Sequence, residues 1–237
     1  MAKRALLVPG LQVKKFVASS RWEKLLRILK KKGWEIYVSN YGNGQPMKKS
    51  LVHYAAFVAE EIKRIHPDVI FAHSMGGLIV RYAIEKLGCG FSGLKVFLME
   101  SPHQGLPDEG VSFGRMLTKV VAFFKKLEGF NWDMEDWESW NDMKKGSGFL
   151  KGLNRDYDPK TRIGVCYYQI GGALNWLFPE TFDLPRSVRE GLPSEIEIKY
   201  HSLTHREIFP TVGHSGLKKN DKVISYMMGI IDGSWNY

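Results

Sequence analysis

The sequence predicts an α/β fold in a single domain over residues 1–237, with a mostly parallel sheet of about six strands flanked by helices. Short apolar runs alternate with amphipathic helical patterns in the first part of the chain, and this order implies parallel strands joined by right-handed crossovers. The alternation stops over about residues 106–160, so we expect a helical cap or lid insertion there, after the fifth strand. A chain of 237 residues suits one such domain and is short for two.

Each predicted element follows from its local pattern. Ala5 to Val8 is an apolar run that Pro9-Gly10 ends, and Ser20 is suited to cap the helix that follows, through about Lys32. Pro67 closes a longer amphipathic helix over about residues 47–65. The remaining elements are strands at 34–39, 69–71, 94–99, 164–170 and 195–200, a helix that includes residues 78–84, and a last helix over about 217–231.

The hexapeptide Ala-His-Ser-Met-Gly-Gly at residues 72–77 lies between a predicted strand and a predicted helix. A serine between small residues at such a turn is typical of a nucleophile elbow, in which a strained backbone with positive φ projects the hydroxyl from the sheet edge. Side chains at Ala72 and Gly76 must be small to avoid clashes, and Gly77 lets the helix lie close to the strand. Ser74 is therefore the predicted nucleophile.

The oxyanion that forms on such a serine needs hydrogen-bond donors. One predicted donor is the backbone N–H of Met75, directly after the nucleophile. The second is the N–H of Leu11, in the loop after the first strand, because Gly10 lets the backbone turn so that this N–H faces inward. A plain strand-ending Pro-Gly turn is the alternative interpretation of this loop.

The serine also needs a histidine base, and an acid that orients the base. His214 lies between glycines just before the last helix and is the predicted base, with His205, early in the same loop, as the alternative. His73 and His103 have poor topology for this role, and we interpret both as structural.

The predicted acid follows the strand that ends at Ile170, because the chain order in this arrangement is serine, acid, histidine. Asp183 is the predicted residue and Glu180 is the alternative.

The predicted insertion carries an apolar stripe at helical spacing and three tryptophans, Trp132, Trp137 and Trp140. It leaves the sheet from the edge that holds Ser74, so it can fold over the site. We expect most of these side chains to pack the cap onto the sheet. Some, with Phe124 and Trp137 as the predicted positions, are expected to line an acyl pocket.

The composition is that of an ordinary globular protein, and the net charge of +9 comes from scattered basic residues, which favours a role in solubility over a nucleic-acid site. No apolar signal segment opens the chain, so we expect a cytoplasmic protein, or a secreted one whose leader has been removed. Cys89 and Cys166 lack metal-ligand spacing and are interpreted as reduced thiols, with a disulfide as the alternative.

The stretches LLVPGL, FAHSMGGLIVRYAI, VFLMESPHQG, GSGFLKGLN and VGHSGLKKNDKVISYM together resemble the α/β-hydrolase superfamily, specifically small bacterial triacylglycerol lipases and GPI-inositol-deacylase-like proteins. The chain departs from these lipases in having Pro9-Gly10 in place of His-Gly, and in only a loose match to their Asp-Gly-Val-Val acid motif at Asp183. The resemblance implies ester hydrolysis with no obligatory cofactor, and no ligand pattern for a structural Ca²⁺ is present.

The leading functional hypothesis is a serine carboxylester hydrolase, a lipase or esterase of lipid metabolism, whose substrate is a small-molecule or lipid ester and which contacts lipid surfaces at most transiently. An acyltransferase or a thioesterase would use the same three residues and is the enzymatic alternative. A lipid-binding protein without catalytic activity is the alternative from another class. The sequence contains no signal for the oligomeric state.

Overall fold

A computed structural model gives the fold of the chain. It describes residues 2–10, 22–42, 48–106, 137–155, 164–172, 204–209 and 216–235.

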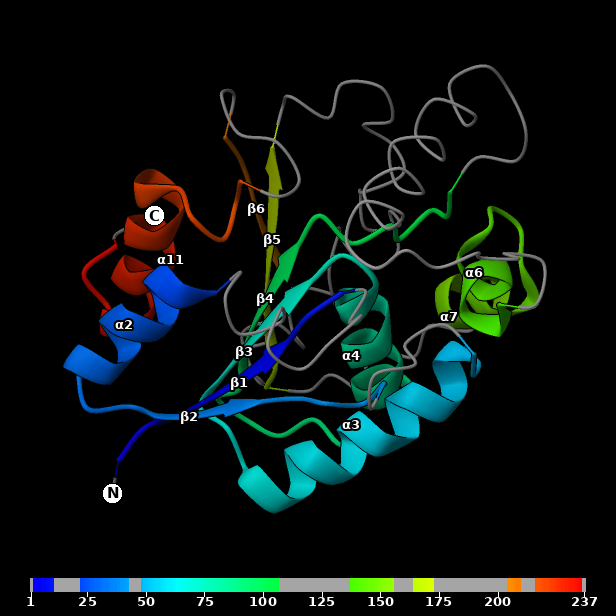
Figure 1. Cartoon of the computed structure of the whole chain (residues 1–237), viewed down its shortest axis with the longest axis horizontal. Helices are drawn as coiled ribbons and strands as arrows, with labels where there is room; N and C mark the ends of the chain where they lie inside the picture. The colour runs from blue at the N-terminus through cyan, green and yellow to red at the C-terminus, as the bar shows by residue number, and fades with distance from the viewer. Residues whose placement is uncertain are drawn as a thin grey trace, which may run out of the picture.

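One six-stranded sheet forms the centre of the molecule, in the order β2-β1-β3-β4-β5-β6, and each neighbouring pair is parallel (Figure 1). The strands are β1 (Arg4–Val8), β2 (Glu35–Val38), β3 (Val69–His73), β4 (Lys95–Met99), β5 (Cys166–Gly172) and β6 (Thr204–Phe209). Because all run in one direction, their carboxyl ends meet at the same edge of the sheet. The predicted fold class is confirmed.

Helices cover both faces of the sheet, with α2 and α11 on one side and α3 and α4 on the other (Figure 1). Their bounds are α2 (Glu23–Lys31), α3 (Leu51–Ile65), α4 (Met75–Glu85) and α11 (Asp221–Asp232). Successive strand residues point to opposite faces, so Ala5 and Leu7 pack beneath α2 and α11, whereas Leu6 and Val8 pack beneath α3 and α4. Because β1, β3 and β4 are buried on both faces, each of these three appears in the sequence as a nearly continuous apolar run.

Local capping sets the ends of the helices. Ser50 precedes α3 with an extended backbone, and its side chain accepts a hydrogen bond from the N–H of His53. Asn220 does the same for α11, accepting from the N–H groups of Lys222 and Val223. Gly233 ends α11 in the left-handed conformation, which glycine adopts without strain.

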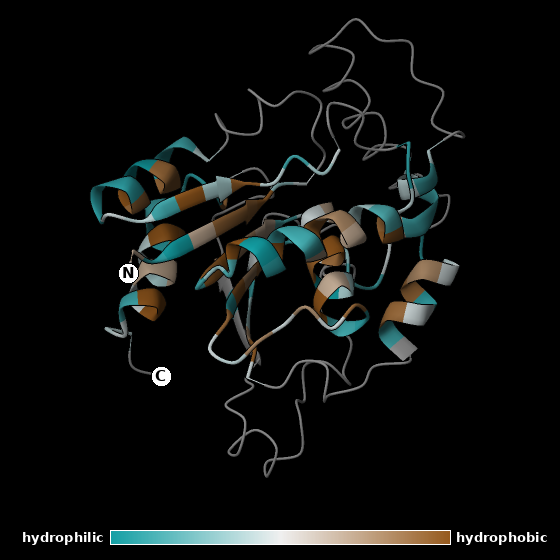
Figure 2. Cartoon of the chain, turned by 90° about the horizontal axis from the view of Figure 1, so that it is seen from below, coloured by the Kyte–Doolittle hydropathy of each residue, from teal (hydrophilic) through white to brown (hydrophobic). Residues whose placement is uncertain are grey.

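Two short helices, α6 (Glu138–Met143) and α7 (Gly148–Arg155), lie on the same side of the sheet as α3 and α4 (Figures 1 and 2). α6 contacts α3, and α7 contacts α4. Their buried side chains, including Trp140, Leu150 and Leu153, join the same core as α3 and α4. They fall within the predicted insertion and are helical, as expected for it.

The sequence misjudged where that insertion lies. Among the described residues four strands precede it, because it connects β4 to β5, so it follows the fourth strand rather than the fifth. The four apolar runs predicted before residue 106 are the strands β1 to β4, so a position after the fifth strand counts one strand too many.

The last described strand also differs from expectation. The predicted strand at 195–200 lies outside the described residues, and the sheet ends with β6 at Thr204–Phe209. This strand contains Thr204, His205, Arg206 and Glu207, and its polar composition resembled a loop. Among the described strands β6 pairs on one side only, and an edge strand of this kind tolerates polar side chains that a central strand would not.

Candidate active site

The sheet order brings together two loops that are distant in sequence. β1 connects to β2 on one side, and the chain then returns to place β3 on the other side of β1. Open parallel sheets bind ligands beyond the carboxyl ends of the strands where the strand order reverses in this way. Gly10, after β1, and Ser74, after β3, therefore lie where a site is expected.

Ser74 has a strained backbone, with φ 57° and ψ −129°. This combination costs a non-glycine residue on the order of 1–3 kcal/mol, so surrounding contacts must hold it in place. The N–H of Ser74 donates to the carbonyl of Met99 at 2.9 Å, and its carbonyl accepts from the N–H of Gly77 at 3.0 Å. The positive φ predicted for the elbow is confirmed.

The glycines after Ser74 allow close packing of the backbone. A Cβ on Gly76 would overlap the carbonyl oxygen of Val8 and lie 2.6 Å from that of Pro9. A Cβ on Gly77 would overlap the hydroxyl of Ser101, in the segment after β4. The first turn of α4 is thus pressed against the end of β1 and the segment after β4, which confirms that residue 76 must be small and that Gly77 lets the helix lie close to the sheet.

Gly10 lies directly against the side chain of Ser74. A Cβ on Gly10 would be 2.8 Å from the Cβ of Ser74 and 3.3 Å from its hydroxyl oxygen. The loop after β1 therefore borders the serine hydroxyl, where the predicted oxyanion loop has to be. Met75, whose N–H is the other predicted donor, begins α4 and is buried.

A second segment reaches the elbow from the far end of the chain. Lys218 is buried, and its Nζ lies 3.3 Å from Nδ1 of His73 and 5.4 Å from the centre of the Trp22 ring. Lys218, four positions after residue 214 in the sequence, thus contacts the residue directly before Ser74. The sequence reasoning did not identify Lys218, and no motif in the sequence marks it.

His205, the alternative base, lies in strand β6 and not in a loop. It pairs with Tyr168 of β5, near the amino end of the strand. Through the pairing of Tyr168 with Phe97, and of Phe97 with Phe71, residue 205 lies in line with Phe71 of β3. Phe71 comes three residues before Ser74, so at ~3.3 Å per residue the backbone of residue 205 is displaced by ~10 Å along the strand direction from Ser74. Three strand spacings also separate β6 from β3, so the alternative is wrong: residue 205 lies too far from the site.

Five predicted site residues lie outside the described residues: Leu11, Phe124, Glu180, Asp183 and His214. In the sequence, positions 180 and 183 come after β5 and position 214 comes after β6.

Comparison with solved structures extends over nearly the whole chain. A lipase of Bacillus licheniformis, BlEst2 in its mature form, superimposes with a TM-score of 0.63 at 14% identity, covering 97% of this chain and 92% of that one. A structure from work on carboxylesterases of Nitrososphaera gargenis gives 0.61 at 11% identity, covering 98% and 90%. A monoacylglycerol lipase of Paleococcus ferrophilus gives 0.56 at 16% identity, covering 97% and 93%.

The chain has the α/β-hydrolase fold. An α/β hydrolase of Desulfitobacterium hafniense matches as well, with a TM-score of 0.58 at 14% identity, covering 97% of this chain and 96% of that one. No family model and no curated protein matches the sequence. At these identities the likeness shows the fold alone.

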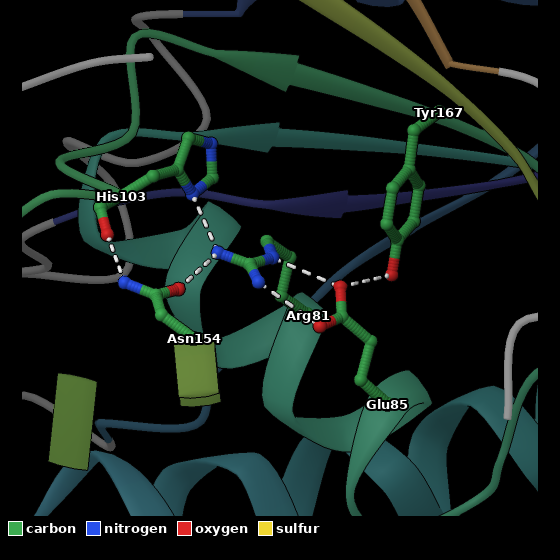
Figure 3. Close-up of polar contacts among 5 residues, drawn as sticks. All are labelled: Arg81, Glu85, His103, Asn154 and Tyr167. Atoms are coloured by element: carbon green, nitrogen blue, oxygen red, sulfur yellow. Dashed lines mark hydrogen bonds and ion pairs between the residues drawn. The ribbon is translucent and has the colours of Figure 1, made fainter. Parts of the chain in front are cut away.

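In this α/β-hydrolase fold, a buried polar cluster is centred on two residues near the carboxyl end of α4, the helix that follows Ser74 (Figure 3). Arg81 and Glu85 of α4 are fully buried and paired through two hydrogen bonds, of 2.9 and 3.0 Å. Tyr167 of β5 donates to the same carboxylate at 3.0 Å. Asn154 of α7 accepts from Arg81 at 3.1 Å and donates to the carbonyl of His103 at 2.7 Å. The cluster joins α4, β5, α7 and the segment after β4.

His103 completes this cluster and is structural, as predicted. Its Nδ1 lies 3.3 Å from Nη1 of Arg81, so it is assigned as the acceptor and Nε2 carries the proton. Burial, and then the charge of Arg81, hold the pKa of His103 well below its ordinary value. Nε2 of His103 and the hydroxyl of Ser101 are buried without a hydrogen-bond partner among the described residues.

Trp137 begins the described part of the insertion, directly before α6, and packs half-buried against the core beneath α3 and α4.

Among the described side chains, no group of three or more His, Cys, Asp or Glu is placed to hold a metal ion. Cys89 and Cys166 are both free thiols, and burial raises the pKa of Cys89 to about 12. None of the described helices is long and apolar enough to cross a membrane.

Proposed function

We propose that this chain is a serine carboxylester hydrolase that cleaves acyl esters of lipid-like alcohols. The observation that carries the proposal is the strained backbone of Ser74, at the amino end of α4 and against the loop after β1. A fold shared with lipases and carboxylesterases supports ester hydrolysis as the reaction type.

In the proposed mechanism, the hydroxyl oxygen of Ser74 attacks the ester carbonyl carbon while His214 takes the hydroxyl proton. The oxyanion accepts hydrogen bonds from the N–H groups of Leu11 and Met75, next to the positive end of the α4 dipole. His214 then gives its proton to the leaving alcohol, and an acyl-enzyme remains on Ser74. A water molecule that gives a proton to His214 then attacks the acyl carbonyl carbon, and His214 returns the proton to the oxygen of Ser74 as the acid leaves. Asp183 holds the imidazole in the required tautomer.

The contact between Lys218 and His73 supports His214 as the base, because it brings the chain that follows residue 214 to the elbow. The insertion, with Trp137 and Phe124, is proposed to cover the acyl chain. Each buried methylene is worth ~0.8 kcal/mol, so we expect esters of medium or longer chains to be cleaved with higher kcat/KM than acetate esters.

The test combines labelling by a fluorophosphonate with hydrolysis of chromogenic esters of increasing acyl length. Ser74→Ala and His214→Ala should each lower kcat by ~10³-fold or more, with no labelling at Ser74→Ala. Asp183→Asn should cost more activity than Glu180→Gln. Ser92→Ala, an exposed serine before β4, is the matched control and should behave as the wild type.

The other functional hypotheses predict different results in the same assay. An acyltransferase would be labelled but would pass the acyl group to an added alcohol faster than to water, and a thioesterase would prefer thioesters to oxygen esters. A lipid-binding protein would not be labelled. A folded Ser74→Ala variant with near-normal esterase activity would overturn the nucleophile assignment.

A further inference from the structure

Tyr41 lies just beyond the end of β2 and reaches the loop after β1 with its hydroxyl. The oxygen is 2.9 Å from the carbonyl oxygen of Pro9 and 2.5 Å from that of Gly10. The side chain is buried, and burial raises the pKa of the hydroxyl well above its ordinary value, so it keeps its proton and donates. One O–H group is thereby shared between two neighbouring carbonyls.

The same short loop is constrained from the opposite direction. Gly10 lies against Ser74, and the carbonyl of Pro9 lies where a side chain on Gly76 would be. The loop is therefore held between Tyr41 and the elbow, and the hydrogen bonds from Tyr41 fix which way its carbonyls point.

The direction of the Gly10 carbonyl matters because of the geometry of the peptide bond. In a planar trans peptide the N–H points opposite to the C=O. A donor that holds the Gly10 carbonyl on one side therefore turns the next N–H to the other side. That N–H is the one assigned to Leu11 in the proposed oxyanion hole.

We propose that Tyr41 is a positioning residue for the oxyanion hole, which it sets by holding the Gly10 peptide bond in one orientation. The inference rests on the proposed function, since it needs an oxyanion on Ser74. Tyr41 touches no reacting atom, so its effect should appear in the stabilisation of the transition state and not in substrate binding.

Tyr41→Phe tests the proposal, with Tyr54→Phe as the matched control. The two rings pack together at 5.2 Å between centres, and the hydroxyl of Tyr54 also makes a backbone hydrogen bond, accepting from the N–H of Lys49. Lys49 lies before α3 and is not part of the loop after β1. Both variants lose one hydroxyl from the same aromatic pair, so loss of packing should affect them alike.

We expect Tyr41→Phe to lower kcat by ~10–100-fold, less than the ~10²–10³-fold typical of removing an oxyanion donor outright, with KM changed less than ~2-fold. Affinity for a trifluoromethyl ketone, which forms an oxyanion on the serine, should fall in parallel with kcat/KM, and fluorophosphonate labelling should slow. Tyr54→Phe should leave all of these near wild-type values.

Equal losses in the two variants, or a change confined to KM, would overturn the role of Tyr41. If the wild type is neither labelled at Ser74 nor active on esters, the proposed function itself fails. That result differs from a failure of the Tyr41 proposal, in which the wild type is active and the two variants lose activity alike. Should Tyr41→Phe not fold, a crystal structure of the phosphonylated wild type decides. The phosphonyl oxygen should lie ~2.7–3.1 Å from the backbone nitrogen of residue 11, and its location elsewhere would overturn the inference.

Discussion

The first turn of α4 and its last two turns are built by opposite means. At the amino end, a strained serine and two glycines let the backbone of α4 approach the end of β1 and the segment after β4, because the glycines have no side chains to keep them apart. Toward the carboxyl end, a buried arginine and glutamate contact α7, β5 and the segment after β4 through charge-assisted hydrogen bonds. The difference teaches that one helix can present a reactive backbone geometry at one end and tie the layers of the fold together at the other.

This comparison predicts a separation of effects. Changes behind the elbow, at the Arg81 cluster, should lower the free energy of unfolding while folded molecules stay active. Changes in the first turn should lower activity by more than the loss of stability explains.

The largest loss of stability is expected for Arg81→Met, because it leaves the Glu85 carboxylate buried without its cation. Removing one partner of a buried ion pair costs ~3–5 kcal/mol, whereas replacing both is often nearly neutral. Urea unfolding should show that loss for the single variant and recovery of most of it in Arg81→Met/Glu85→Gln, since glutamine still accepts from Tyr167. Equal stability of the single and double variants would contradict the account.

Gly76→Ala comes next, with an expected loss of ~1–3 kcal/mol in the free energy of unfolding. The added methyl group overlaps the carbonyl oxygens of Val8 and Pro9 and forces α4 away from the end of β1. Esterase activity per folded molecule should fall by at least ~10-fold, since a small misplacement of the nucleophile is costly. Gly152→Ala, at an open position in α7, is the control: it should raise the free energy of unfolding by ~0.5–1 kcal/mol, because alanine is the better helix former, and leave activity unchanged. Normal activity in folded Gly76→Ala would show that the close approach is not needed for catalysis.

The smallest effect is the pH dependence contributed by His103. Its folded pKa is depressed, so below about 6.5 the unfolded chain binds a proton that the folded protein does not. The free energy of unfolding should therefore fall as pH drops from 7.5 to 5, with a contribution from this residue of at most ~1.4 kcal/mol per pH unit. Unfolding curves of His103→Gln should show a shallower decline over the same range, and an identical decline would mean that other groups cause it.

Much of the fold and part of the site could be predicted from the sequence. Buried parallel strands are apolar throughout, amphipathic helices repeat at helical spacing, and a serine before two glycines marks a strained turn, so each of these features has a local signature. The Arg81 and Glu85 pair has helical spacing too, but nothing local distinguishes a buried pair from an exposed one. The polar edge strand β6 was missed because an edge position is defined by its neighbours in space.

By itself, the sequence determined the order of the strands through β5, the class of sheet and the position of Ser74, because these depend on periodicity and on backbone sterics within a few residues. Only the tertiary structure decided that β1 lies beside β3, that Gly10 contacts Ser74, and that Tyr41 and Lys218 reach this region. The register of β6 also places residue 205 within the strand and away from Ser74. The physical reason is that these contacts join residues tens to more than a hundred positions apart, and strand pairing sets such contacts without leaving a local pattern.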